Sequence, residues 1–167
     1  MHSPFKSHLK TAFKILRYLK GSPGLGIHFV KTSGMSLRDF SDADWDKIVI
    51  TRKSVTGYCV FLNDSLISQE SKKQNTLFKS STKSEYKALA SVTSEAIWIL
   101  KILKNLKIEK LLPVDLQCDS VVKTVKVEST NHIADFFTKG LGTVHHKNFL
   151  EELGMLDVYQ VEMKGGC

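Results

Sequence analysis

The fold is decided at residues 55–70, which read VTGYCVFLNDSLISQE. Two extended runs rich in β-branched and aromatic residues flank Asn63-Asp64, a pair that favours a tight turn, so the stretch predicts a β-hairpin. Similar runs occur on both sides of it, and the sequence predicts strands at residues 36–42, 55–62, 64–70 and 76–80. Because no helical pattern separates these strands, we expect an antiparallel meander.

A long helical pattern follows the meander at residues 83–106. Its apolar residues are too numerous for one narrow stripe, so this helix is expected to lie across a sheet and to be buried on more than one side. Pro113 introduces a strand at 114–119, and a strand reached through a helix is most naturally parallel to an earlier one. Two shorter helices are expected at 132–139 and 144–153. The order of elements therefore predicts an α/β fold with a mixed sheet.

The net charge of +7 is concentrated at the start of the chain, where the first 38 residues hold seven basic and no acidic side chains. Residues 6–20 place apolar side chains at three- and four-residue spacing, which predicts an amphipathic helix. Its polar face carries four basic residues: Lys6, Lys10, Lys14 and Arg17. Such a face either contacts the phosphates of a nucleic acid or is merely solvated.

Length and composition limit the class of protein. A chain of 167 residues, 42% of them hydrophobic, can bury one sizeable core. It contains no apolar run long enough to span a membrane and no apolar block typical of a signal peptide, so we expect a soluble intracellular protein, cytoplasmic or nuclear. Its three cysteines lack metal-binding spacing and are expected to be reduced. The histidines His132, His145 and His146 are expected at the surface.

Four acidic residues stand where a strand is expected to end or a helix to begin: Asp42, Glu85, Asp119 and Asp135. Taken singly, each acid is more often a surface residue than a ligand. Carboxylates that converge at one edge of a sheet repel one another, and a bound divalent cation is the usual reason to tolerate them. Oxygen ligands favour Mg²⁺ or Mn²⁺, and two such ions can cleave a phosphodiester.

The chain resembles, over nearly its whole length, the ribonuclease H end of copia-type LTR retrotransposon Pol polyproteins of plants. The stretches that carry the resemblance include Phe40–Trp45 (FSDADW), Thr51–Leu62 (TRKSVTGYCVFL), Ser84–Leu89 (SEYKAL) and Ala134–Lys139 (ADFFTK). The resemblance implies a ribonuclease H-like mixed sheet and an endonuclease that degrades the RNA strand of RNA/DNA hybrids during reverse transcription. It also implies two Mg²⁺ (or Mn²⁺) ions held by Asp42, Glu85, Asp119 and Asp135, with Asp44 in a supporting role.

The same resemblance implies a division of the chain. Residues 1–24 would be a basic helix from the tail of the reverse transcriptase or connection region, 34–141 the ribonuclease H-like domain, and 142–167 a C-terminal helix and tail. The partners implied are an RNA/DNA hybrid and, in intact elements, the reverse transcriptase portion of the same polyprotein.

This copy looks shortened between Asp119 and Asp135, which only 15 residues separate. A parallel crossover alone needs about a dozen residues before its following strand is counted. We therefore expect a truncated last crossover, with residues 121–127 antiparallel to 114–119 or irregular. An uncovered sheet edge and a missing helix are expected to cost several kcal/mol in a domain whose total stability is about 5–15 kcal/mol.

Three functional hypotheses follow from these observations. The chain could be an active ribonuclease H, although the shortened crossover predicts an impaired one. It could be a catalytically inactive retroelement remnant that still binds nucleic acid through its basic helix. It could also be an unstable relic with no molecular role.

Overall fold

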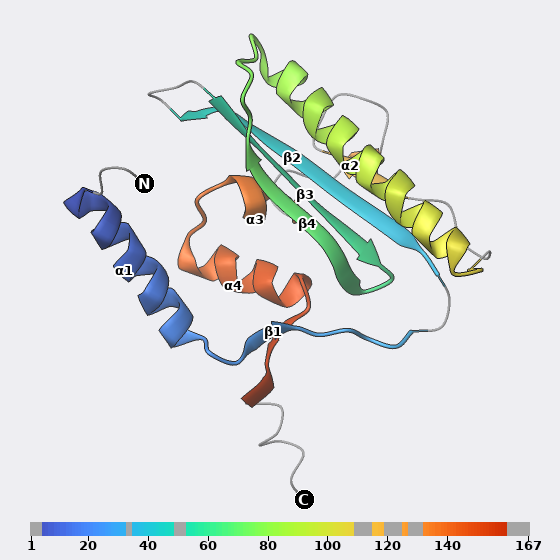
Figure 1. The fold of residues 1–167 in the computed structure, drawn as a ribbon, viewed down its shortest axis with the longest axis horizontal. Helices are drawn as coiled ribbons and strands as arrows, with labels where there is room; N and C mark the ends of the chain where they lie inside the picture. Colours follow the sequence, from blue (N-terminus) through green and yellow to red (C-terminus); the bar gives the residue numbers. More distant parts are fainter. Residues whose placement is uncertain are drawn as a thin grey trace, which may run out of the picture. The chain divides into compact units, whose positions relative to one another are not determined.

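The computed structural model describes residues 5–32, 35–48, 53–108, 115–118, 125–126 and 132–159. The chain divides into two compact units, Met1–His28 with Met155–Cys167 and Phe29–Gly154. Figure 1 traces the chain through both units. Among the helices within these ranges, none combines the length and the apolar content needed to cross a membrane.

The first unit contains α1 (Lys6–Gly21), β1 (Leu25–Ile27) and β7 (Met155–Asp157). The amphipathic helix expected at 6–20 is thus confirmed, and it ends where glycine and proline follow. β1 and β7 pair in antiparallel orientation, and the backbone N–H of Val158 donates to the carbonyl of Gly24 at 2.9 Å. A pair of short strands therefore joins the two ends of the described chain.

The second unit is built on a five-stranded sheet in the order β4-β3-β2-β5-β6. Its strands are β2 (Leu37–Ile48), β3 (Lys53–Leu62), β4 (Ser65–Lys73), β5 (Asp115–Cys118) and β6 (Val125–Lys126). β2, β3 and β4 form the predicted antiparallel meander. β5 pairs in parallel with β2, as the helical crossover predicted. The α/β class and the mixed sheet are confirmed.

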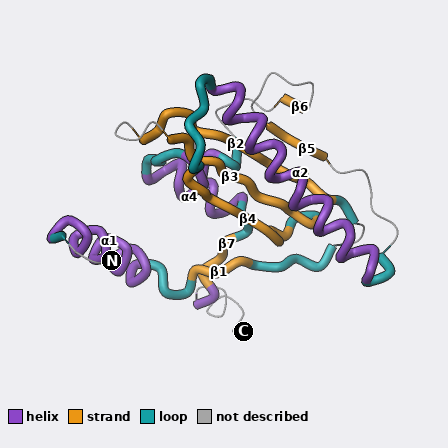
Figure 2. Tube along the Cα trace, turned by 45° about the horizontal axis from the view of Figure 1, so that its top comes forward, coloured by secondary structure: helices purple, strands orange, loops and turns teal. Residues whose placement is uncertain are grey.

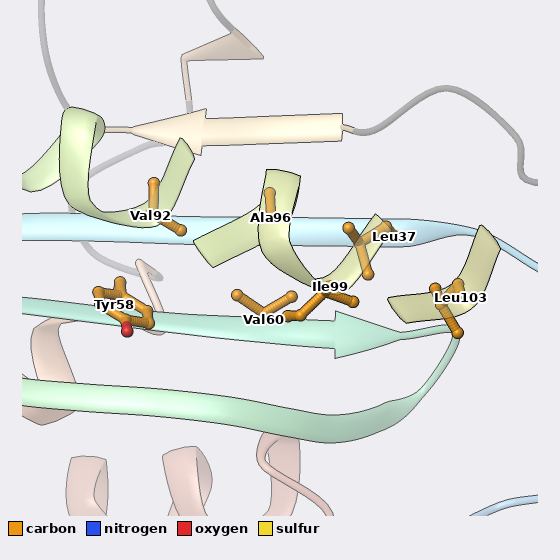
Figure 3. Close-up of a cluster of buried hydrophobic side chains, with 7 residues drawn as sticks. All are labelled: Leu37, Tyr58, Val60, Val92, Ala96, Ile99 and Leu103. Atoms are coloured by element: carbon orange, nitrogen blue, oxygen red, sulfur yellow. The ribbon is translucent and has the colours of Figure 1, made fainter. Parts of the chain in front are cut away.

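The long helix α2 (Ser81–Asn105) covers one face of this sheet (Figures 1 and 2). It begins at Ser80, whose hydroxyl accepts a hydrogen bond from the backbone N–H of Lys83 at 3.4 Å. Side chains alternate between the two faces of a strand, so every second residue of β2 and β3 meets α2. Figure 3 shows the resulting core: Leu37, Tyr58, Val60, Val92, Ala96, Ile99 and Leu103.

Two shorter helices, α3 (Asp135–Thr138) and α4 (Thr143–Glu152), lie against the other face of the sheet (Figure 1). On this face the rings of Phe40 and Phe61 meet edge to face at 5.7 Å between centroids. α4 matches the helix expected at 144–153. α3 is shorter than the helix expected at 132–139, because the chain forms a turn before Asp135.

Two expectations about the middle of the chain are wrong. Residues 76–80 form no strand: they lead from β4 into α2, and the carbonyl of Phe78 accepts a hydrogen bond from the indole N–H of Trp45 at 3.0 Å. A short apolar run carries no periodicity that would separate a strand from a connection. The helix α2 is also buried on one side only, since Tyr86, Ile97 and Trp98 are exposed.

The predicted direction of residues 121–127 is wrong where the structure describes them. β6 runs parallel to β5, with Gln117 paired to Val125 and Cys118 paired to Lys126. The expectation was based on the dozen or so residues of a full parallel crossover, whereas the observed pairing comprises only two residues of each strand. Residues 121–124 and 127 lie outside the described residues.

Candidate functional site

Asp42 was expected where a strand ends, but β2 continues past it to Ile48, so that Asp42 lies inside the strand. Its side chain faces the side of the sheet that α3 covers. Side chains along a strand alternate between its two faces. Leu37 faces α2, and Asp42 is an odd number of residues further along β2, so its side chain points to the opposite face. The side chain is almost fully buried, at 3% exposed. Its Oδ2 accepts a hydrogen bond from the hydroxyl of Thr138, a residue 96 positions later in the chain. The fold therefore joins two motifs, FSDADW and ADFFTK, at one carboxylate.

Gly57 explains why α3 can come so close to the sheet. It is paired with Asp42 across the β2–β3 ladder. A Cβ atom at Gly57 would lie 2.6 Å from Cβ of Phe137 and 2.8 Å from Cγ2 of Thr138, both shorter than real contacts. The hydroxyl of Ser71 on β4 also donates to the carbonyl of Phe137 at 2.5 Å. α3 is thus pressed onto β3 and tied to β4.

Asp135 is the first residue of α3, and it shares a cation with Asp42. The ammonium of Lys139 lies 2.7 Å from Oδ1 of Asp135 and 3.9 Å from Oδ1 of Asp42. Burial raises the pKa of Asp135 above the ordinary carboxyl value, and the negative charge of Asp42 raises it further. The hydrogen bond and positive charge of Lys139 act against this rise, as does His132. Two predicted site residues are therefore brought together.

Glu85 is not brought into one group with this pair. It lies in the second turn of α2, on the helix that covers the opposite face of the sheet. Its side chain is half-buried, and the oxygen Oε2 is shielded from solvent. Within the described ranges, no three acidic, histidine or cysteine side chains are close enough to hold a metal ion together.

Asp119, the fourth predicted ligand, lies outside the described residues. Its neighbour Cys118, the last described residue of β5, pairs with Ser41, and Ser41 precedes Asp42. Asp44, to which the resemblance gives a supporting role, is half-buried in β2.

The pair formed by Asp42 and Asp135 fits a hard divalent cation. Its donor atoms are carboxylate oxygens, which are the ligands that Mg²⁺ and Mn²⁺ prefer. The pair already shares one cationic group, the ammonium of Lys139, so both carboxylates can face the same positive charge.

The four basic residues predicted to bind nucleic acid lie on α1, in the first unit. All of Lys6, Lys10, Lys14 and Arg17 are exposed, and no residue of α1 is buried. The apolar face of the helix is exposed as well, as shown by Leu9 and Leu16 at 58% each. The helix thus offers both a cationic and an apolar face.

The sequence reasoning missed several residues that shape the site. Thr138 and Lys139 end the ADFFTK motif, and the i, i+4 spacing from Asp135 to Lys139 was a readable signal on a helix. Gly57 carried no comparable signal, because its role depends on a helix far along the chain. The prediction that His132 lies at the surface is wrong, because it is fully buried. Its ring packs against the ring of Phe40, with 6.2 Å between the two centroids. Neither ring nitrogen has a hydrogen-bond partner among the described residues.

The relatives that match 95% of the chain are Pol polyproteins of plant transposons. No protein-family model matches the chain. The chain is 32% identical over 95% of its length to the retrovirus-related Pol polyprotein from transposon RE1 of Arabidopsis thaliana, and 31% identical over 95% to that from transposon RE2. A shorter match, 40% identical over 58% of this chain and 68% of the relative, is to the secreted RxLR effector protein 161 of Plasmopara viticola.

The chain spans 13% of the length of each of the RE1 and RE2 polyproteins. The RE1 alignment has 191 positions and this chain has 167 residues, so RE1 carries at least 24 residues inside the matched span that have no counterpart here. This agrees with a shortened copy. The location of the missing segment after Asp119 stays a prediction.

Proposed function

The chain belongs to the retrovirus-related Pol polyproteins of plant copia-type transposons, and from that membership we propose that it is a ribonuclease H portion, which hydrolyses the RNA strand of RNA/DNA hybrids. The observation that carries the proposal is the meeting of Asp42 and Asp135 on one cation. These residues come from two distant motifs of the family. The mixed sheet with β5 parallel to β2 supports a ribonuclease H-like fold.

The proposed ligands are Asp42 and Asp135, which the fold brings together, and Glu85 and Asp119, which the family resemblance adds. Two divalent ions held there, Mg²⁺ or Mn²⁺, would supply an activated water and would neutralise charge on the phosphate that is attacked. Thr138 holds Asp42 in place through Oδ2, which leaves Oδ1 directed toward the shared cation. Burial of both carboxylates excludes water and strengthens their attraction for a cation.

The proposed substrate is recognised in two ways. The four basic residues of α1 would contact backbone phosphates, which are common to every sequence. The hybrid itself would be recognised by its shape and by the 2′-hydroxyls of its RNA strand. In intact elements the reverse transcriptase portion would supply the hybrid, within the cytoplasm or the nucleus.

The test is cleavage of a labelled RNA/DNA hybrid by the purified chain, with Mg²⁺ or with EDTA. We expect cleavage with Mg²⁺ only, and a loss of at least about 100-fold in Asp42→Asn, because even residues behind a metal ligand typically contribute 10–100-fold. The matched control is Asp64→Asn, which changes an exposed aspartate at the β3–β4 turn and should leave the rate unchanged.

A folded wild-type chain that binds the hybrid without cleaving it would overturn the nuclease proposal. That result would leave the second hypothesis, a remnant that binds nucleic acid. Cleavage that survives in Asp42→Asn would also overturn the proposal, since it would come from another site or from a contaminant.

A further inference from the structure

We propose that Lys139 is a resident counter-cation, whose ammonium occupies the place of a divalent ion between Asp42 and Asp135 and must leave before the ion binds. This inference rests on the proposed function, because it concerns the same two carboxylates. It assigns to Lys139 the role of a positioning residue that competes with the metal.

The first support is the geometry of the charges. One ammonium lies 2.7 Å from Asp135 and 3.9 Å from Asp42, both measured to Oδ1. The two carboxylate side chains are 10% and 3% exposed, so little water screens their mutual repulsion. A nearby cation therefore stabilises the two ionised carboxylates in the metal-free protein, and the Lys139 side chain supplies it.

The second support is that Lys139 can leave without disturbing the helix that carries it. α3 is held by other groups: the Thr138 hydroxyl on Asp42, the Ser71 hydroxyl on the Phe137 carbonyl, and its close contact with Gly57. The Lys139 side chain follows the helix end, is 38% exposed and has a flexible four-carbon stem. Its ammonium can move into solvent while Asp42 and Asp135 stay in place.

The third support is that the two cations cannot share the site. Asp42 has one oxygen bonded to Thr138, and its other oxygen faces Lys139. A divalent ion held by the two carboxylates would compete with Lys139 for the Asp42 oxygen that is not bonded to Thr138, and its charge would repel an ammonium a few ångströms away. Binding of the ion and retention of Lys139 are therefore alternatives.

The experiment measures Mn²⁺ binding to the full chain from the electron paramagnetic resonance signal of free Mn²⁺. We expect Lys139→Met to bind Mn²⁺ about tenfold more tightly than wild type, or about 1.4 kcal/mol, because the ion no longer has to displace a charge-assisted hydrogen bond. The matched control is Lys147→Met, which removes an exposed lysine of α4 and should leave the affinity unchanged. Adding Asp42→Asn to Lys139→Met should abolish the gain.

A second measurement follows unfolding in EDTA, where no ion replaces Lys139. Lys139→Met is expected to melt at a lower temperature than wild type, and Asp42→Asn in the same chain should restore part of the loss by removing the repulsion. If Lys139→Met does not fold, Lys139→Gln gives the same two measurements with an uncharged side chain that can still donate a hydrogen bond.

The outcomes separate this inference from the proposed function. Equal or weaker Mn²⁺ binding in folded Lys139→Met, with wild type binding Mn²⁺ at the Asp42 site, overturns the counter-cation role and leaves the nuclease proposal standing. A gain that persists after Asp42→Asn also overturns it. If neither folded protein binds Mn²⁺, the metal-dependent function fails and this inference fails with it.

Discussion

Two neighbouring residues, Thr138 and Lys139, reach Asp42 through different oxygens, and only one of them also reaches Asp135. At the scale of single residues, two effects oppose each other at the site. Burial destabilises the two ionised carboxylates, and the nearby ammonium of Lys139 stabilises them. The raised pKa of Asp135 shows which effect is larger, since burial outweighs the contribution of Lys139.

The pH dependence of stability should report this balance at Asp135. Because its pKa is raised on folding, the folded chain binds a proton more tightly than the unfolded chain, and the free energy of unfolding falls as pH rises through the raised pKa. Asp135→Asn removes the free-energy cost of burying an ionised carboxylate, while the amide oxygen of the new side chain can still accept a hydrogen bond from Lys139. In EDTA, we expect this variant to melt at a higher temperature than wild type at pH 7.

The difference should vanish below about pH 3, where the carboxyl is protonated in both folded and unfolded chains. Thermal melts followed by circular dichroism at both pH values provide the measurement. The control is Glu151→Gln at an exposed position of α4, which should melt as wild type does at both pH values. An equal or lower melting temperature for Asp135→Asn at pH 7 would contradict the assignment of burial as the larger effect.

At the scale of elements, the site depends on how closely α3 approaches β3. That distance is set by the absence of a side chain at Gly57, while Ser71 ties the same helix to β4. The helix itself is short, at four residues, and hydrogen bonds within so few residues cannot hold it in place. The position of α3 is therefore set by its contacts with β3 and β4 and not by the hydrogen bonds inside the helix.

Gly57→Ala tests that contact. The added methyl group would overlap Phe137 and Thr138, so α3 must shift, and we expect a loss of about 1–3 kcal/mol in the free energy of unfolding, as for other overpacked cores. Urea denaturation gives the value. Gly140→Ala is the matched control, because a methyl group there meets nothing within 4 Å. Equal stability of the two variants would show that α3 does not press on β3.

At the scale of the whole molecule, basic charge and the carboxylate pair belong to different units of the chain. α1 is in the first unit and the pair is in the second. Affinity for a nucleic acid and cleavage of it should therefore be separable by mutation. The first depends on phosphate contacts along α1, and the second depends on Asp42 and its neighbours.

Salt dependence of hybrid binding tests the first of these. Replacing the four basic residues of α1 (Lys6, Lys10, Lys14 and Arg17) with glutamine should lower the slope of log affinity against log salt by about 3, since each phosphate contact contributes about 0.7–0.9. Fluorescence anisotropy of a labelled hybrid at several salt concentrations measures the slope. The control replaces four exposed lysines of the second unit: Lys101, Lys104, Lys107 and Lys147. A larger change of the slope in the control would show that the nucleic-acid-binding surface lies on the second unit instead.

The amino-acid sequence by itself determined those features that depend on residues near one another in the chain. The amphipathic α1, the hairpin at Asn63-Asp64 and the long helix α2 follow from periodicity and turn chemistry. The parallel pairing of β5 follows from the helix that precedes it. The placing of Asp135 at a helix start was predictable in the same way, whereas Asp42 was expected at the end of a strand and lies inside β2.

Tertiary structure alone decided which of these elements touch. Four features depend on contacts between separate elements. They are the ammonium of Lys139 shared by two carboxylates, the contact of α3 with Gly57, the burial of His132 and the parallel direction of β6. Trp98 on α2 is exposed because no described element covers that side of the helix. The apolar pattern of the helix does not show which of its sides will be covered. The physical reason is that burial and close contact depend on the neighbours in space, whereas local conformation depends on the neighbours in sequence.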